Sequence, residues 1–322
     1  MGELVAPGLI DLQVNGAYGH DFTSDPTSIW EVGRRLPEQG VTGFLPTIIT
    51  SPPEVMERAI EAIQSRPANY LGAEPLGLHF EGPMLSPNRP GVHDPALMRP
   101  PSPDLIETWT AANGVLMLTL APELPGAEAV VKTLTQAGVI VSAGHTAATY
   151  EEAQAGFDWG ITAVTHLFNA MAPFGHRAPG LIGATFDSAV AGLICDGVHV
   201  HPAAVRTAWR MLGPDRLVLV TDAVAAAGMG DGTYRLGNAE IVVSQGRATD
   251  QAGRLAGSTL TLDQAVRNLI EFTDCPPMVA IGAASTVPAR LLGGLENPGR
   301  VVFDDSMEVA STSVRGEIVW RR

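Results

Sequence analysis

An α/β fold, specifically a barrel of eight parallel strands, is the fold class that the sequence predicts. Eight short apolar runs alternate along the chain with helical or irregular segments, which is the rhythm of a (β/α)8 TIM-like barrel. Ionisable residues come just after several of these runs, at the strand ends where such barrels carry their chemistry. The runs are 9–14, 43–49, 76–80, 115–120, 139–143, 161–165, 191–195 and 217–220.

Helix signals lie between these runs. Ser51, followed by two prolines, predicts the start of a helix, because serine is a favoured N-cap and proline is tolerated in the first turn. Thr149 with Glu152 three residues later has the spacing of a capping box, and the helix that it opens is expected to end at Gly160. Strand, helix and strand in this order predict a parallel sheet.

The composition indicates one large core and a water-soluble protein. The 322 residues are 45% hydrophobic with a net charge of −14, and the mean hydropathy is +0.14. So acidic a chain is a poor partner for nucleic acid or an anionic membrane.

The sequence shows no secretion leader and no apolar run of membrane-spanning length. Two cysteines, Cys195 and Cys275, give no disulfide framework, so we expect a cytoplasmic protein.

A metal site is predicted at one edge of the sheet. His145 and His166 each follow a predicted strand, and the helix between those strands places both strand ends on the same edge. Histidines at strand ends also serve simply as hydrogen-bond partners of loops, so the pair alone does not distinguish a metal site from a structural role. Glu81 ends a third run, and two imidazoles with one carboxylate form the ligand set of a catalytic zinc-type site.

Two more ionisable residues share this rim. Asp222 ends the eighth run and His199 follows the seventh. An aspartate there can equally be a helix cap or part of a turn. The other ionisable residues at the ends of the predicted strands favour a functional role for Asp222. Lys132 is the single lysine of the sequence and falls in a predicted helix. A site in which a modified lysine bridges two metals is therefore excluded.

Five motifs in order resemble the amidohydrolase superfamily, and within it the N-acetylglucosamine-6-phosphate deacetylase family. The motifs are LHFEGP, GHTAATYEEA, THLFNAM, CDGVHV and LVTDA. The resemblance runs from PGLIDLQVNG near the start to LAGSTLTLDQAVRNL at 255–269 and beyond, so it covers nearly the whole chain.

The resemblance implies a role for each matching residue. It makes Glu81, His145 and His166 the metal ligands and Asp222 the catalytic acid and base, and it lets His199 contact the substrate and polarise the acetyl carbonyl. It implies one divalent ion per chain, with zinc expected and iron, cobalt or manganese able to use the same ligands. The remaining residues implied to bind the amino-sugar phosphate are Gln13, His93, Asn169, Ala170, Arg177 and Leu255.

The sequence departs from the wider superfamily in two places. Gln13 and Asn15 stand where many amidohydrolases have His-x-His, and because amides are poor ligands for zinc-class ions we expect a single metal. Few residues precede Pro7, so the small β domain of the family is expected to be reduced and built mainly from C-terminal strands. We expect the barrel at 7–295 and this β appendage at 1–6 and 296–322, with a hairpin-like segment at 234–250 as a further candidate.

The activity implied by the resemblance is removal of the acetyl group from N-acetylglucosamine 6-phosphate by a metal-activated water. Asp222 would take the proton of the water and return it to the departing amine. The resemblance also implies a homodimer, in which Arg177 binds the phosphate held by the neighbouring subunit. Two alternatives stay open: a metal-dependent hydrolase of another amide, cyclic amide or deaminase substrate, and a non-catalytic barrel.

Overall fold

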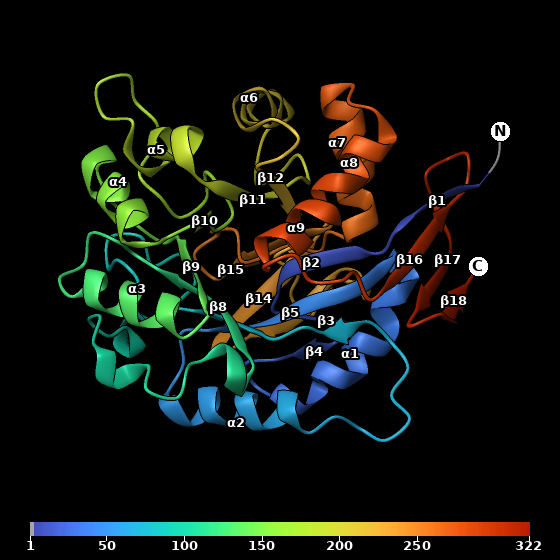
Figure 1. The fold of residues 1–322 in the computed structure, drawn as a ribbon, viewed down its shortest axis with the longest axis horizontal. Coiled ribbons are helices and arrows are strands. Elements are labelled where there is room, and N and C mark those ends of the chain that lie inside the picture. Colours follow the sequence, from blue (N-terminus) through green and yellow to red (C-terminus); the bar gives the residue numbers. More distant parts are fainter. Residues whose placement is uncertain (1–2) are drawn as a thin grey trace.

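A barrel of parallel strands forms the centre of the protein, whose computed structural model describes residues 3–322. Eight strands pair in the order β2-β5-β7-β8-β9-β10-β11-β12, and the short β6 (Glu74–Pro75) adds to β5. The helices surround this sheet (Figure 1), so the predicted fold class is confirmed. The eight strands are β2 (Leu9–Val14), β5 (Val41–Ile49), β7 (Leu78–Glu81), β8 (Val115–Leu120), β9 (Ile140–Ala143), β10 (Ala163–Val164), β11 (Val190–Ile194) and β12 (Leu217–Val220).

The barrel closes where β12 meets β2. Val14 forms a parallel bridge with Ala223, and the backbone N–H of Asp222 donates to the carbonyl of Gln13 at 2.9 Å. The hydroxyl of Thr221 donates to the buried Asp11 carboxylate at 2.6 Å. This seam brings Gln13 and Asp222 side by side, although 209 positions separate them in the sequence.

The strands are apolar because the barrel buries both of their faces. Every residue of β2 and β5 is buried, as expected for parallel strands with helices outside and side chains packed inside. The predicted run 161–165 shortens to β10 (Ala163–Val164), because the backbone turns into a left-handed conformation at His166, whose φ is 28°.

Helices α1 to α6 lie between successive barrel strands, and α7 to α9 follow the last of them. The prediction that Ser51 caps the second of these helices is wrong: Pro52 is the N-cap residue, and the Ser51 hydroxyl donates to the Ile49 carbonyl at 2.7 Å. The capping box of Thr149 and Glu152 is confirmed, and that helix ends before Gly160. The α-helices are α1 (Ile29–Arg35), α2 (Pro53–Gln64), α3 (Ala127–Gln136), α4 (Tyr150–Trp159), α5 (Gly180–Ser188), α6 (Pro202–Leu212), α7 (Leu262–Thr273), α8 (Pro277–Ala283) and α9 (Thr286–Leu291). Single turns of 3-10 helix are η1 (Pro26–Ser28), η2 (Leu36–Gln39), η3 (Pro95–Leu97), η4 (Pro103–Leu105) and η5 (Ala111–Asn113).

A separate antiparallel sheet joins the two ends of the chain. It pairs β1 (Leu4–Pro7), β16 (Gly299–Phe303), β17 (Val309–Val314) and β18 (Glu317–Arg321) in that order. Three of its four strands are C-terminal, as the fold class predicts, and it lies at one side of the barrel (Figure 1). Residues 1–2 of the expected appendage lie outside the described residues.

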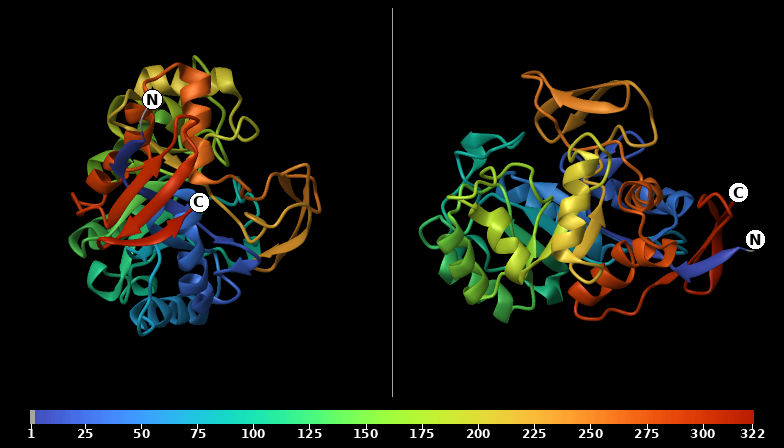
Figure 2. Two further views of the ribbon diagram at one scale, coloured as in Figure 1. Left: turned by 90° about the vertical axis from the view of Figure 1, so that its right-hand side faces the viewer. Right: turned by 90° about the horizontal axis from the view of Figure 1, so that it is seen from above.

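The segment around 234–250 does not join this sheet. It forms a small antiparallel sheet of its own from β13 (Gly232–Leu236), β14 (Ala239–Ser244) and β15 (Arg247–Asp250). Figure 2 shows that this small sheet projects from the barrel away from the four-stranded sheet. Its apolar side chains pack on Ile49, Val224 and Ala226, next to the ends of β5 and β12. A two-stranded ribbon, β3 (Gly16–Ala17) with β4 (His20–Asp21), completes the strands.

None of the helices in the described part of the chain is both long enough and apolar enough to span a membrane.

Candidate active site

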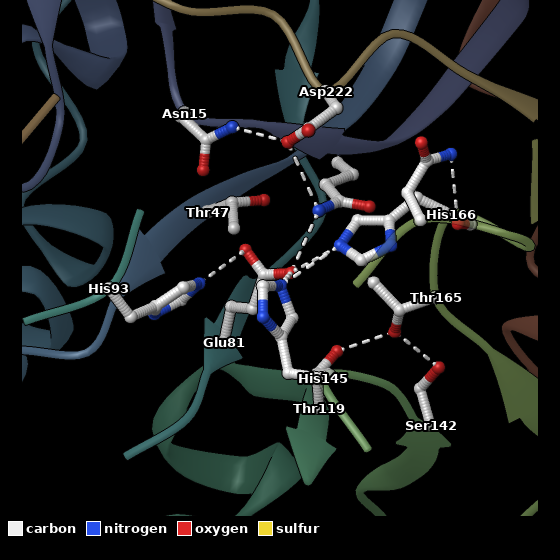
Figure 3. A network of polar contacts seen from close by, with 12 residues as sticks. Asn15, Thr47, Glu81, His93, Thr119, Ser142, His145, Thr165, His166 and Asp222 are labelled. Atoms are coloured by element: carbon white, nitrogen blue, oxygen red, sulfur yellow. Dashed lines mark hydrogen bonds and ion pairs between the residues drawn. The ribbon is translucent and has the colours of Figure 1, made fainter. Parts of the chain in front are cut away.

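The ends of four barrel strands carry the residues of the candidate site. Glu81 is the last residue of β7, while His145, His166 and Asp222 each lie two positions beyond β9, β10 and β12. Those last three have left-handed backbones with φ of 46°, 28° and 51°, a conformation that costs energy for residues other than glycine. The turn directs each side chain into the space above the barrel, where Figure 3 shows them facing one another.

Three donor atoms converge at one point. Glu81 Oε1 lies 3.0 Å from His166 Nε2 and 3.2 Å from His145 Nε2, and the two ring nitrogens are 3.1 Å apart. All three side chains are at most 6% exposed. In a tetrahedral zinc site with ligand distances near 2.0–2.1 Å, donor atoms are separated by about 3.3 Å. The triangle therefore has nearly the dimensions of one face of such a site.

The hydrogen bonds of His145 show that its Nε2 is a lone-pair atom. Its Nδ1 lies 3.0 Å from the carbonyl oxygen of Arg89, which can only accept a hydrogen bond, so Nδ1 carries the proton. Burial, with the nearby His93 ring, lowers the pKa of His145 to about 4, so the ring is neutral near pH 7. Two acceptors, Nε2 of His145 and Oε1 of Glu81, thus face each other and repel unless a cation lies between them.

Glu81 is ionised despite its burial. Burial alone would raise its pKa, but contacts with the rings of His166 and His93 hold the pKa well below its ordinary range. One negative charge and two imidazole nitrogens suit a divalent cation of the zinc class. The residues present fit the ion that the sequence predicted.

His93 belongs to the same cluster, but its hydrogen bonds favour a donor role over metal binding. Together with Glu81 and His145 it forms a group whose ligand atoms lie within 4.8 Å of one another. However, its Nδ1 accepts the backbone N–H of Thr50 at 3.3 Å, so the neutral ring carries its proton on Nε2. That nitrogen is 3.7 Å from Glu81 Oε2. We therefore prefer His166 to His93 as the third ligand.

Asp222 is held by the two amides that replace the superfamily histidines. Gln13 Nε2 donates to Asp222 Oδ1 at 3.1 Å and Asn15 Nδ2 donates to the same oxygen at 2.7 Å. Gln13 Nε2 also lies 3.2 Å from Glu81 Oε1, so its NH₂ group bridges the two carboxylates. Burial and the Glu81 charge raise the pKa of Asp222 to about 6, which suits a group that takes and returns a proton near neutral pH.

A cavity of about 190 Å³ gathers most of the predicted residues. Glu81, the four histidines at 93, 145, 166 and 199, and Asp222 line it together with Asn169, Ala170 and Leu255. Gln13 lies behind the carboxylates and is not among the lining residues, and Arg177 is exposed in the loop before α5. The lining residues that sequence reasoning did not single out include Ile49, Gly91, Val92, Ile194, Leu236 and Gly257.

Sequence reasoning missed two buried or half-buried carboxylates. Asp196 contacts the His199 ring, and Asp11 lies under the seam between β2 and β12. The spacing of Asp196 three residues before His199 was a usable signal, because a loop aspartate often binds backbone and side-chain groups two or three residues ahead. Asp11 gave no such signal, because its partner Thr221 is 210 positions away.

Comparison with known proteins shows the family of the chain. The amidohydrolase family matches residues 4–301. The chain is 40% identical to the human N-acetylglucosamine-6-phosphate deacetylase, covering 99% of this chain and 84% of that protein. It is 37% identical to the N-acetylgalactosamine-6-phosphate deacetylase of Escherichia coli O157:H7, covering 98% of this chain and 88% of that protein.

A solved structure shows the same fold. It is an aspartate-to-alanine mutant of the N-acetyl-D-glucosamine-6-phosphate deacetylase of Mycobacterium smegmatis, in complex with N-acetyl-D-glucosamine-6-phosphate. The TM-score is 0.91 at 35% identity, and the match covers 98% of this chain and 87% of that one. The chain therefore belongs to the amidohydrolase family, and within it to the N-acetylglucosamine-6-phosphate deacetylases.

Proposed function

We propose that this protein hydrolyses the acetamide of N-acetylglucosamine 6-phosphate, giving glucosamine 6-phosphate and acetate. The observation that carries the proposal is the convergence of Glu81, His145 and His166 beside Asp222 in one cavity. The kinship to deacetylases of this name supplies the substrate, because the fold alone does not fix it.

The metal of this proposal is a single divalent ion, with zinc as the expected element. Glu81, His145 and His166 would hold it, and when bound it lowers the pKa of a water molecule and polarises a carbonyl group. Gln13 and Asn15 support a single ion, because both amides turn their NH₂ groups towards carboxylates and donate to them. An NH₂ group has no lone pair to offer a metal, and the amide oxygen is a weaker ligand for a zinc-class ion than imidazole.

Asp222 acts as the proton carrier. Both amides bind its Oδ1, and among the described residues its Oδ2 accepts no hydrogen bond. That oxygen is therefore free to take a proton from the attacking water and later to deliver it to the amine that leaves. A pKa raised to about 6 allows both transfers near neutral pH.

The remaining predicted residues surround the sugar. Asn169, Ala170, His93 and Leu255 line the cavity and would contact the substrate there. Arg177 is exposed and outside the lining, so we assign it to the phosphate bound by a second copy of the chain in a homodimer. We retain the cytoplasm as the expected location; both cysteines are free and buried.

The direct test is release of free amine from N-acetylglucosamine 6-phosphate by purified protein, with bound metal quantified in the same sample. N-acetylgalactosamine 6-phosphate is the competing substrate to include, because a relative 37% identical bears that name. Unphosphorylated N-acetylglucosamine is the control for the phosphate. Rapid release from the first sugar, with about one metal per chain, supports the proposal. A folded, metal-loaded protein that releases no amine from it contradicts the proposal.

A further inference from the structure

Asp196 and His199 form a hydrogen-bonded pair in the loop after β11. His199 Nδ1 lies 2.6 Å from Asp196 Oδ2, and the two side chains are only 6% and 15% exposed. The other carboxylate oxygen, Oδ1, accepts the backbone N–H groups of Val198 at 2.8 Å and of His199 at 2.7 Å. One carboxylate therefore fixes both the backbone and the ring of His199.

The loop that carries this pair is itself anchored. The side-chain amide of Asn268 in α7 donates to the carbonyl oxygen of Cys195 at 2.7 Å. The ring of Phe272, also in α7, packs close to Gly197, whose φ is 75°. The loop thus presents His199 to the catalytic cavity from a fixed position.

The pairing decides where the His199 ring carries its proton. Burial would raise the pKa of Asp196, but the contact with His199 and the two backbone donors hold it below its ordinary value. An ionised carboxylate only accepts hydrogen bonds, so Nδ1 of His199 must donate. The other nitrogen, Nε2, then holds a lone pair in the neutral ring and becomes a donor only in the imidazolium.

We infer that Asp196 is a positioning residue that orients the His199 ring, with Nδ1–H on the carboxylate and Nε2 facing an oxygen of the substrate, to which the imidazolium form can donate. Only the identity of that oxygen, the acetamide carbonyl, rests on the proposed deacetylase function. The carboxylate stabilises the cation by charge and by the short hydrogen bond. A donor already held in place strengthens catalysis because it needs no rearrangement when negative charge develops on the oxygen.

The charged groups around His199 show why its pairing with Asp196 matters for the charge of the cavity. Across the cavity it meets the carboxylates of Asp222 and Glu81 and the rings of His93, His145 and His166. In α7, Arg267 is paired with Asp263 at 2.8 Å. Among the described lining residues there is no lysine or arginine. His199 is therefore the side chain of the lining best able to give an anionic substrate a positive charge.

Two variants separate the charge of Asp196 from its structural role. In Asp196→Asn the side-chain oxygen can still accept the N–H groups of Val198 and His199, while the negative charge beside Nδ1 is lost. Asp196→Ala removes both. Asp304→Asn is the matched control, since Asp304 Oδ1 accepts the N–H groups of Ser306 at 2.8 Å and Glu308 at 3.0 Å in the four-stranded sheet.

The first readout is the protonation of the His199 ring in metal-free protein without substrate. Histidine is labelled with ¹⁵N, the ring nitrogens are followed by NMR from pH 5 to 9, and the His199 signals are assigned with His199→Gln. We expect Nδ1 to be protonated throughout in the parent protein. In Asp196→Asn the imidazolium should lose its proton at a pH lower by about one unit or more, with no change in Asp304→Asn. This readout does not depend on any substrate.

The second readout is the kinetics of the metal-loaded enzyme on N-acetylglucosamine 6-phosphate. In Asp196→Asn we expect kcat/KM to fall on the order of 10²-fold, with unchanged metal content and a loss that deepens as the pH rises. If Asp196→Asn keeps the parental His199 titration, or if it keeps parental kinetics while only Asp196→Ala loses activity, Asp196 merely shapes the turn and the inference is wrong. An inactive parent protein would contradict the proposed function alone, because the NMR result would still decide the inference.

Discussion

Single residues in this site owe their properties to what surrounds them, and Asp222 is the clearest case. Glu81 and Asp222 are both buried carboxylates, yet the histidine contacts hold the pKa of one low while burial and the Glu81 charge raise the pKa of the other to about 6. One carboxylate is thereby suited to a cation and the other to a proton. The sequence named both residues but could not give this difference, which depends on contacts between distant strands.

Replacing Asp222 by Asn should abolish turnover and leave metal binding intact. The amide cannot take a proton from water, whereas the converging donors of Glu81, His145 and His166 do not include Asp222. We expect kcat to fall on the order of 10³-fold, measured as amine release, with metal content unchanged. Asp231→Asn, in an exposed loop, is the control. Full activity in the Asp222 variant would remove it as the proton carrier.

Asp11 should make the protein less stable as the pH rises from 5 to 7. Burial raises its pKa from 3.8 to about 7, so the folded protein keeps a proton that the unfolded chain has released. That stabilisation is complete below pH 3.8 and is lost as the pH rises through about 7. Between those values this residue lowers the free energy of unfolding by up to about 1.4 kcal/mol per pH unit.

Asp11→Asn tests this pH dependence, because the amide can still accept the Thr221 hydroxyl but does not titrate. Denaturant unfolding of metal-free protein at several pH values should show a flatter dependence in Asp11→Asn than in the parent. The exposed Asp158→Asn is expected to keep the parental slope. The same slope in Asp11→Asn and in the parent would mean that Asp11 is ionised in the folded protein.

At the scale of elements, the sequence predicted the strands well and the turns after them poorly. Apolar runs located all eight barrel strands, since burial on both faces leaves little choice of residue. The left-handed turns at His145, His166 and Asp222 could not be predicted, because even His and Asp, which adopt that conformation more often than most residues other than glycine, do so too seldom for the residue type to indicate it. The prediction that Ser51 caps α2 was wrong because the Ser51 hydroxyl donates to the Ile49 carbonyl, and Pro52 is the N-cap residue.

The capping box of α4 should contribute measurably to stability. Thr149 Oγ1 accepts the N–H of Glu152 at 3.2 Å, and Glu152 Oε2 accepts the N–H of Thr149 at 2.8 Å. Thr149→Ala removes the first bond and is expected to cost about 1 kcal/mol of unfolding free energy. Thr133→Ala is the control, because that exposed hydroxyl only bonds within α3 and its loss should stay within about 0.5 kcal/mol. Equal effects of the two changes would show that the capping box contributes nothing to the free energy of unfolding.

For the whole molecule, the barrel and its C-terminal sheet could be predicted from the sequence, but the separate small sheet β13-β14-β15 could not. That sheet packs on Ile49 and Val224, and Leu236 from it lines the catalytic cavity. The pattern of 234–250 predicts a hairpin but cannot say which part of the fold receives it, because the contacts come from strands far away in the sequence. The cavity is thus formed by the barrel and by an element outside it.

The exposed position of Arg177 makes a prediction about assembly. If Arg177 binds the phosphate held by a second copy, Arg177→Ala should raise KM for the phosphorylated sugar by about 10- to 100-fold, as for loss of a charge-assisted hydrogen bond. KM for the unphosphorylated sugar should not change, and the exposed Arg210→Ala should leave both constants unaltered.

Mixing two defective chains tests whether the arginine acts across a dimer. An Arg177→Ala chain keeps Asp222, and an Asp222→Asn chain keeps Arg177. In a hybrid dimer the first chain would receive the arginine of the second, so one site would be complete and the low KM would return. If Arg177 instead serves its own chain, no hybrid holds a complete site, and refolding the two variants together restores nothing. Sedimentation of the same mixture shows whether dimers form at all, which separates failure to assemble from failure to share the residue.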